Sequence, residues 1–192
     1  MRLILASASE RRKELLRKYI TQKFEVVISN FDEKKVKFNG NCSEYVIEIA
    51  KGKVNAVSNS IIEPVYIIGC DTVVYIDGKI LGKPKDKKDA FNMLKLLSGK
   101  IHKVYSGIVI KDTASCNTYT DYACTSVKFS NISDDEIYNY LEKGEYADKA
   151  GAYGIQGSAA LFVEKIDGCF YNVVGLPLNK LYKGLKKVGV NL

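Results

Sequence analysis

The sequence is poor in the residues that build zinc sites and disulfide frameworks. It contains a single histidine, His102, and five widely scattered cysteines that form no CxxC pair. This composition excludes a histidine-rich metal site and argues against a disulfide framework or a structural zinc site. A bound metal should therefore be a hard cation held by oxygen atoms, such as Mg²⁺ or Mn²⁺. Unpaired cysteines are also typical of a reducing compartment, which predicts a cytoplasmic protein.

Long hydrophobic runs are also missing. No apolar run approaches the roughly 20 residues that span a bilayer, and the apolar start at residues 1–6 is too short for a signal peptide. The chain has no internal repeat, no low-complexity tract and no linker rich in Pro, Gly or Ser. Its 192 residues fit one domain, or one domain with two lobes. We predict a single domain over residues 1–192 and no membrane partner.

The formal net charge is +7, so the protein should prefer anions. Both nucleic acid and a small polyphosphate fit this charge. The lysines are spread along the chain, however, and the only tight basic cluster is Arg11-Arg12-Lys13. No nucleic-acid-binding motif is present and the basic residues form no single stripe. These features favour a small polyphosphate over a nucleic-acid partner.

Strand and helix patterns alternate along the chain. Strands are predicted over residues 2–6, 24–29, 65–76, 103–110 and 119–129, with short extended segments at 159–166 and 171–174. Helices are predicted over 9–19 and 43–57, between Pro84 and Ser98, from Ser133 to about 142, and after Pro177. Tight-turn signals such as Asp77-Gly78 indicate hairpins, which exclude a purely parallel sheet. The sequence therefore predicts an α/β protein with a mixed sheet.

The segment from Leu5 to Leu16 runs from a strand, through small residues, into a helix that begins with two arginines. Such a turn offers backbone N–H groups, the positive end of a helix dipole and bidentate arginines to a phosphate. It lacks the glycine and lysine pattern of a Walker loop. A plain strand–helix connection with surface arginines explains the segment equally well.

Asp71 is the most unusual residue of the chain, because it interrupts the apolar strand over 65–76. A carboxylate there is costly unless a cation, a metal or a hydrogen-bond donor receives it. The alternative is a bulge or strand end at which Asp71 caps the next turn. Lys83, between Gly82 and Pro84 after the hairpin, is placed to meet a phosphate, although this signal is weak alone.

The segment over 148–157 is rich in glycine and small residues around Tyr153 and Gln156. Such backbone can press closely against a ligand. The amide of Gln156 both donates and accepts, so it could read the edge of a nucleobase. A series of tight turns is the alternative interpretation.

Taken together, these segments resemble the Maf family. ASASERRKELL, DTVV followed by LGKP, DKAGAYGIQG and NVVGLPL occur in the family's order and spacing over almost the whole chain. Maf proteins were first described as septum-formation inhibitors and are now regarded as house-cleaning nucleotide pyrophosphatases. The resemblance implies a fold similar to that of inosine triphosphate pyrophosphatases, with a long mixed sheet, flanking helices and two lobes around a cleft.

The resemblance also implies roles for individual residues. The catalytic aspartate, a presumed proton acceptor, falls on Asp71, and Asp71 with Glu33 would hold a divalent metal. The substrate-binding positions fall on Arg12, Glu33, Lys53 and Lys83. The positions that separate the family's specificity groups fall on Arg11, Thr72 and Gln156, all as in the dTTP/UTP group. Glu10, which replaces the family's usual proline, and Cys70, where alanine is common, are departures outside this chemistry.

The implied reaction is hydrolysis of dTTP, UTP and modified pyrimidine nucleotides to the monophosphate and pyrophosphate. A 7-methyl-GTP pyrophosphatase is the alternative within the family, although that group usually carries Trp and an acidic residue at two of the specificity positions. A non-catalytic nucleotide-binding regulator of cell division is the alternative outside enzymes. The resemblance allows a homodimer and leaves the oligomeric state open.

Overall fold

The computed structural model describes residues 2–190, which form two compact units. The first unit takes the residues up to Asp71, Ser106–Ala123 and the residues from Gly175 onward. The second takes Thr72–Tyr105 and Cys124–Val174. No helix within residues 2–190 is long and apolar enough to cross a membrane.

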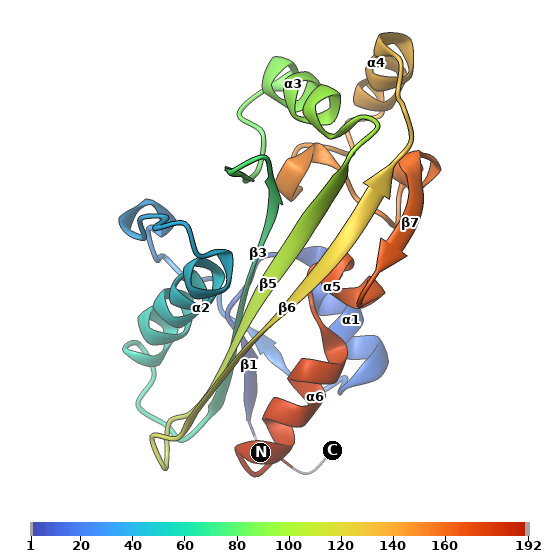
Figure 1. The fold of residues 1–192 in the computed structure, drawn as a ribbon. Helices are drawn as coiled ribbons and strands as arrows, with labels where there is room; N and C mark the ends of the chain where they lie inside the picture. The colour runs from blue at the N-terminus through green and yellow to red at the C-terminus, as the bar shows by residue number, and fades with distance from the viewer. Residues whose placement is uncertain (1, 191–192) are drawn as a thin grey trace. The chain divides into compact units, whose positions relative to one another are not determined.

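A seven-stranded sheet contributes to both units (Figure 1). Its strands are β1 (Leu3–Leu5), β2 (Glu25–Val26), β3 (Tyr66–Ile76), β4 (Lys79–Leu81), β5 (Ile101–Asp112), β6 (Thr118–Phe129) and β7 (Val163–Asp167). The order is β2-β1-β3-β5-β6-β7, with β4 paired to β3. β1 runs parallel to β2 and β3, whereas β4 is antiparallel to β3 and β7 to β6. The predicted mixed sheet is therefore confirmed.

The first unit carries helices α1 (Glu10–Tyr19), α2 (Cys42–Ser58) and α6 (Leu178–Lys187), and a 3-10 helix at Glu33–Lys35. Asn41 caps α2 by accepting hydrogen bonds from the amides of Ser43 and Glu44. Glycines let the sheet approach its helices closely: a Cβ at Gly107 would clash with the α2 backbone, and one at Gly184 of α6 would clash with Ile110. Residues 107 and 110 point to opposite faces of β5, so α2 and α6 cover opposite faces of the sheet, as predicted.

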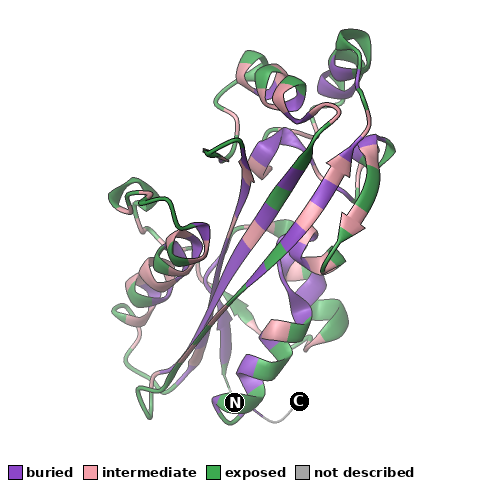
Figure 2. Ribbon diagram, in the orientation of Figure 1, coloured by how far each residue is buried: buried purple, intermediate pink, exposed green. Residues whose placement is uncertain are grey.

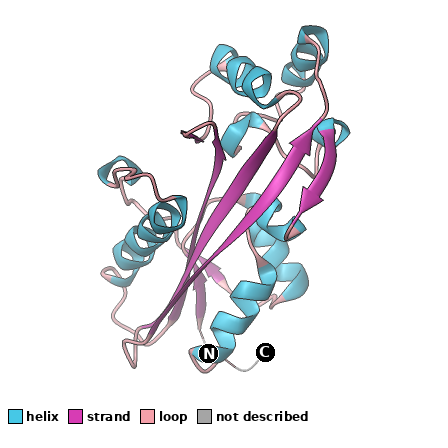
Figure 3. Cartoon of the chain, in the orientation of Figure 1, coloured by secondary structure: helices cyan, strands magenta, loops and turns pink. Residues whose placement is uncertain are grey.

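The second unit contains α3 (Lys87–Leu97), α4 (Asp134–Glu142), α5 (Phe170–Val174) and two 3-10 helices, Ala150–Ala152 and Ser158–Phe162. Helix α4 begins where the sequence predicts, with a capping box: the Ser133 amide donates to the Glu136 carboxylate, and the Glu136 amide donates to Ser133 Oγ. The apolar faces of α3 and α4 join an aromatic-rich core with Phe129 and Phe162. Figure 3 shows these helices, and Figure 2 shows the buried stretches of the strands.

Two local predictions need correction. Residues 171–174, predicted as extended, form α5, and the first part of 159–166 is a 3-10 helix, with β7 starting at Val163. The side chain of Asn172 explains the first error, because its amide donates to Val104 O and Thr125 Oγ1, both at 2.9 Å. These tertiary contacts override the β propensity of the neighbouring valines. Ser9 is the N-cap residue of α1, but its side chain makes no capping hydrogen bond.

Candidate active site

Asp71 lies in the middle of β3, with strand residues on both sides. This position excludes the alternative that Asp71 marks a strand end. β3 is buried along most of its length (Figure 2). The Asp71 side chain is only 11 % exposed. Because strand side chains alternate, Asp71 shares a face with Gly69. A Cβ at Gly69 would clash with Ala50 of α2, so this face of β3 looks onto α2.

The cation that receives Asp71 is Lys53 of α2. Lys53 Nζ lies 2.7 Å from Asp71 Oδ1 and 2.8 Å from Glu33 Oε1. The Lys53 side chain is 12 % exposed, whereas Glu33 is 54 % exposed and faces solvent. The lysine therefore bridges two carboxylates, and the three side chains together carry one net negative charge. We call Glu33, Lys53 and Asp71 the acidic–lysine cluster.

Local packing explains why Glu33 reaches this cluster. Gly52 precedes Lys53 on α2, and a Cβ at this position would overlap the ring of Phe31. The glycine therefore lets the segment around Phe31 lie directly on α2. Asp32 then caps the short helix Glu33–Lys35 by accepting a hydrogen bond from the Lys34 amide. As a result, the Glu33 carboxylate lies next to the ammonium of Lys53.

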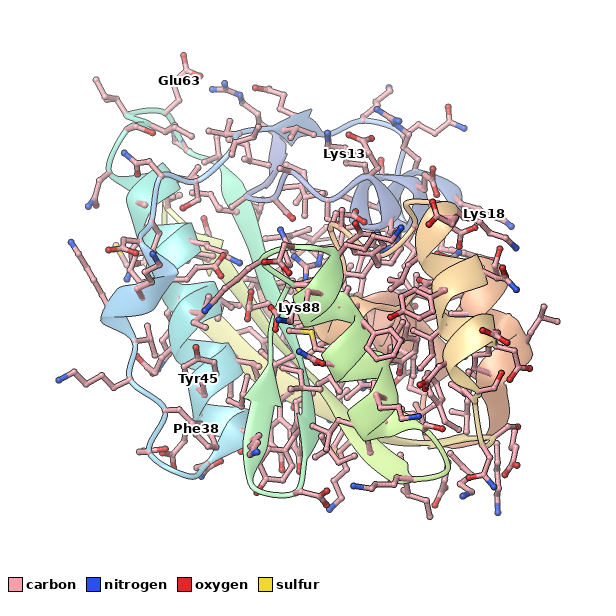
Figure 4. The ribbon with its side chains drawn as sticks, turned by 90° about the horizontal axis from the view of Figure 1, so that it is seen from above. Lys13, Lys18, Phe38, Tyr45, Glu63 and Lys88 are labelled. Atoms are coloured by element: carbon pink, nitrogen blue, oxygen red, sulfur yellow. The ribbon has the colours of Figure 1, made fainter. Side chains whose placement is uncertain are left out.

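Tyr45 is a neighbour of the cluster that sequence reasoning missed. It lies about two turns before Lys53 on α2 and packs edge-to-face against Phe38, with ring centroids 5.7 Å apart (Figure 4). Burial raises the pKa of Tyr45, and the charges of Asp71 and Glu33 raise it further. Its helical offset from Lys53 is the one sequence signal that could have found it.

Arg12 is buried, so the alternative of a plain surface arginine is wrong for this residue. Its Nε donates to Gly175 O at 2.8 Å, and its Nη1 donates to Cys70 O at 2.9 Å and to Ser7 Oγ at 3.2 Å. Cys70 directly precedes Asp71. The guanidinium therefore fixes the end of β1, the centre of β3 and the Gly175 segment, and it places positive charge beside the strand that carries Asp71.

The remaining predicted residues are not part of the acidic–lysine cluster. Arg11 is half-buried on α1, and Thr72 is half-buried on β3, where strand alternation turns its side chain to the face opposite Asp71. Lys83 and Gln156 are exposed residues of the second unit. The segments that carry them are joined by a hydrogen bond from the Gly151 amide to Gly82 O, 3.0 Å long. The substrate and specificity roles of these four residues stay predictions.

The donor set of the cluster fits a hard divalent cation that is shared with a substrate. Within residues 2–190 no group of three or more His, Cys, Asp or Glu side chains could hold a metal by itself. Asp71 and Glu33 offer carboxylate oxygens that both lie within 2.8 Å of the same atom, Lys53 Nζ. Mg²⁺ is usually bound by one or two carboxylates together with water and substrate phosphates. None of the five cysteines forms a disulfide.

The fold and the cluster define a mixed α/β protein whose acidic and basic side chains are suited to phosphate chemistry. The chain belongs to the Maf family: the model of that family, described as Maf-like protein, matches residues 2–188. A dTTP/UTP pyrophosphatase of Clostridium tetani is 58 % identical over 100 % of both chains. A dTTP/UTP pyrophosphatase of Clostridium novyi is 57 % identical, again over 100 % of both chains.

Two solved structures are similar at a lower level. A HAM1 protein from Coxiella burnetii has 14 % identity and a TM-score of 0.47, and the match covers 97 % of this chain and 99 % of that one. A nucleoside-triphosphatase / dITP/XTP pyrophosphatase from Mycobacterium abscessus has 10 % identity and a TM-score of 0.40, with 69 % and 76 % covered.

Proposed function

We propose that this protein hydrolyses dTTP and UTP to the monophosphate and pyrophosphate. The observation that carries the proposal is the carboxylate of Asp71 inside a buried strand. Lys53 forms an ion pair with this carboxylate and a second ion pair with Glu33. A charge in such a position is costly and is retained where it has chemical work. Full-length relatives at 57–58 % identity bear the name dTTP/UTP pyrophosphatase, which supplies the substrate.

Asp71 is the proposed proton acceptor for the attacking water. The water oxygen forms a bond to the α-phosphorus, and the bond from that phosphorus to the oxygen bridging to the β-phosphorus breaks. Pyrophosphate leaves with the electron pair, and the proton of the water passes to the Asp71 carboxylate. In-line displacement at phosphorus needs mainly positioning and charge stabilisation, which fixed side chains can supply.

The basic residues are proposed to bind the triphosphate. Lys53 already lies beside Asp71, so a phosphate that reaches Asp71 also meets an ammonium group. Arg12 adds positive charge next to β3, and Lys83 is the third proposed phosphate ligand. A bound Mg²⁺ or Mn²⁺, held by Asp71 and Glu33, would neutralise charge that develops on the phosphate oxygens.

Arg11, Thr72 and Gln156 are proposed to select the base. The Gln156 amide can pair with the O4 and N3–H edge of uracil or thymine, which presents an acceptor beside a donor. Cytosine presents a different pattern at that edge. The single domain over residues 1–192 and a location in the reducing cytoplasm complete the proposal.

A substrate panel tests this function. The protein is incubated with dTTP, UTP, CTP, GTP, dATP and 7-methyl-GTP in the presence of Mg²⁺ or Mn²⁺, and both products are measured. We expect pyrophosphate and the monophosphate, with dTTP and UTP turned over fastest. Release of inorganic phosphate and a nucleoside diphosphate would mean cleavage at a different bond. Faster turnover of 7-methyl-GTP than of dTTP and UTP would select the alternative substrate. Absence of turnover with every nucleotide would support a non-catalytic regulator.

A matched pair of variants separates Asp71 from other aspartates of the same hairpin. Asp77 lies six positions further along the chain, is exposed, and pairs with Lys100 at 2.9 Å. Asp71→Asn should lower kcat/KM by about 10³, whereas Asp77→Asn makes the same chemical change and should preserve turnover. Equal effects of the two substitutions would remove the observation on which the proposal depends.

A further inference from the structure

His102 is a buried titratable group that the proposed reaction does not use. It lies on β5 with 1 % of its surface exposed. Its Nε2 is 2.8 Å from the hydroxyl of Tyr153, and among residues 2–190 its Nδ1 has no hydrogen-bond partner. Its ring packs edge-on against Phe129 and Tyr153, at centroid distances of 4.9 and 5.4 Å. Among residues 2–190, the hydroxyl of Tyr153 is therefore the one polar group that contacts the His102 imidazole.

Tyr153 follows a strained stretch of backbone. Gly151 has φ 68°, and Ala152, which is fully buried, has φ 62°. A residue with a side chain rarely takes positive φ, so the surrounding contacts must hold Ala152 in this conformation. Tyr153 supplies such contacts directly after it, because its ring is buried against Phe129, at a centroid distance of 4.8 Å, and its hydroxyl is held by His102.

The same stretch is connected to both proposed ligand residues of the second unit. On one side, the Gly151 amide donates to Gly82 O at 3.0 Å, and Gly82 precedes Lys83. On the other side, Gln156 lies three residues after Tyr153 and two before Ser158. The amide and the hydroxyl of Ser158 both bond the Glu145 carboxylate at 2.8 Å. Gln156 is therefore an exposed residue on a short bridge between two anchors.

We infer that His102 and Tyr153 form a positioning pair that fixes the Gln156 bridge and the Lys83 turn for nucleotide binding. The inference rests on the proposed function, because it assigns Gln156 and Lys83 to the substrate. Neither residue of the pair touches the nucleotide in this scheme; both act through the backbone of Gly151 and Ala152. Burial lowers the pKa of His102 to about 4, so the imidazole is neutral near pH 7 and makes a neutral hydrogen bond to the hydroxyl.

Tyr153→Phe tests the pair, because it keeps the ring and removes the hydroxyl. We expect KM for dTTP and UTP to rise about fivefold or more with kcat within about twofold, the signature of lost substrate binding. The ratio of kcat/KM for dTTP to that for GTP should fall as well. The matched control is Tyr138→Phe in the same unit, because Tyr138 is an exposed residue, with 52 % of its surface accessible. This control should leave both quantities at the wild-type value.

A second pair of variants keeps the test decisive if Tyr153→Phe folds poorly. His102→Gln offers an amide to the Tyr153 hydroxyl and should keep most of the wild-type selectivity for dTTP over GTP. His102→Leu offers no polar group and should lose that selectivity. A lower Tm with KM and selectivity unchanged in Tyr153→Phe and in His102→Leu would reduce the pair to a stabilising contact and overturn the inference.

Hydrogen exchange separates failure of this inference from failure of the proposed function. The amides of Gly151 and Ser158 should exchange faster in Tyr153→Phe than in wild type or in Tyr138→Phe, whether or not any nucleotide is hydrolysed. Unchanged protection of both amides would refute the positioning role even in an active enzyme. Faster exchange in a protein that hydrolyses no nucleotide would instead reject the function and leave the structural coupling in place.

Discussion

Replacing Asp71 by Asn removes one charge from the acidic–lysine cluster while keeping the shape of the side chain. Lys53 then loses its charged partner at 2.7 Å, although the asparagine oxygen can still accept a hydrogen bond, and it keeps the Glu33 carboxylate at 2.8 Å. Breaking a buried ion pair outright costs about 3–5 kcal/mol, because one charge stays buried without a partner. Here Glu33 still receives the ammonium, so we expect the free energy of unfolding to fall by about 1–3 kcal/mol, below that range.

The effect on turnover should be much larger than the effect on stability. An asparagine cannot accept the proton of the attacking water, and losing a general base typically costs about 10²–10⁴ in rate. We therefore expect kcat/KM for dTTP to fall by about 10³, with the protein still folded at the assay temperature. Pyrophosphate release gives the rate, and urea unfolding of the same preparation gives the stability.

A double-mutant cycle with Lys53→Met measures the pair itself. If the two side chains interact as the structure places them, the stability effects of Asp71→Asn and Lys53→Met should be coupled by about 1–3 kcal/mol. Near-normal turnover by Asp71→Asn would refute its role as proton acceptor. Additive stability effects would refute the energetic importance of the ion pair.

Three further outcomes are expected. Activity should depend on Mg²⁺ or Mn²⁺ and be lost in EDTA, with no zinc in the purified protein by elemental analysis; full activity in excess chelator would contradict this. Gln156→Glu should cut kcat/KM for dTTP and UTP and narrow their lead over other triphosphates, at roughly 1–3 kcal/mol per mismatched polar group; a uniform loss on all substrates would make Gln156 structural. His102 has a folded pKa of about 4 against 6.5 in the unfolded chain, so protons bind preferentially to the unfolded state. The stability that depends on neutral His102 is complete above pH 6.5 and is lost as pH falls toward 4, by up to about 3 kcal/mol, and His102→Gln should flatten that part of the urea-unfolding profile.

Much of the fold could be predicted because its long elements carry clear periodic patterns. Helix α2 repeats apolar residues at Val46, Ala50, Val54 and Val57, and all four are buried. The short elements near the C-terminus escaped, because five-residue segments give too few positions to distinguish helix from strand. At residues 170–174 the deciding interaction is made by Asn172, whose partners lie 47 and 68 positions earlier in the chain. Secondary-structure propensity depends on neighbouring residues only, so it cannot predict such a long-range contact.

One part of the candidate site could also be predicted from the sequence, and another part could not. Burying the Asp71 carboxylate inside an apolar strand costs free energy unless a partner receives it, and the sequence alone shows that such a partner is needed. The compensating partner is invisible by this reasoning, since Lys53 is one of many lysines and nothing in the residues around it marks it out. The resemblance to the Maf family assigns roles to Glu33 and Lys53, and the structure adds the reason why Lys53 lies beside Asp71 and Glu33 beside Lys53. Two glycines, Gly52 and Gly69, permit the close approaches that bring them there.

His102 shows why a residue type can be informative and yet be misjudged. As the only histidine it excludes a histidine metal site by count, and the count says nothing more about it. The predicted strand starts at residue 103, whereas β5 starts at Ile101, so His102 fell just outside the element that buries it. Once it is placed in β5, its hydrogen bond to Tyr153 connects it with the glycine-rich segment that carries Gln156. The proposed role of the buried imidazole is to fix the conformation of that segment, and Tyr153→Phe distinguishes this role from a contact that only stabilises the fold.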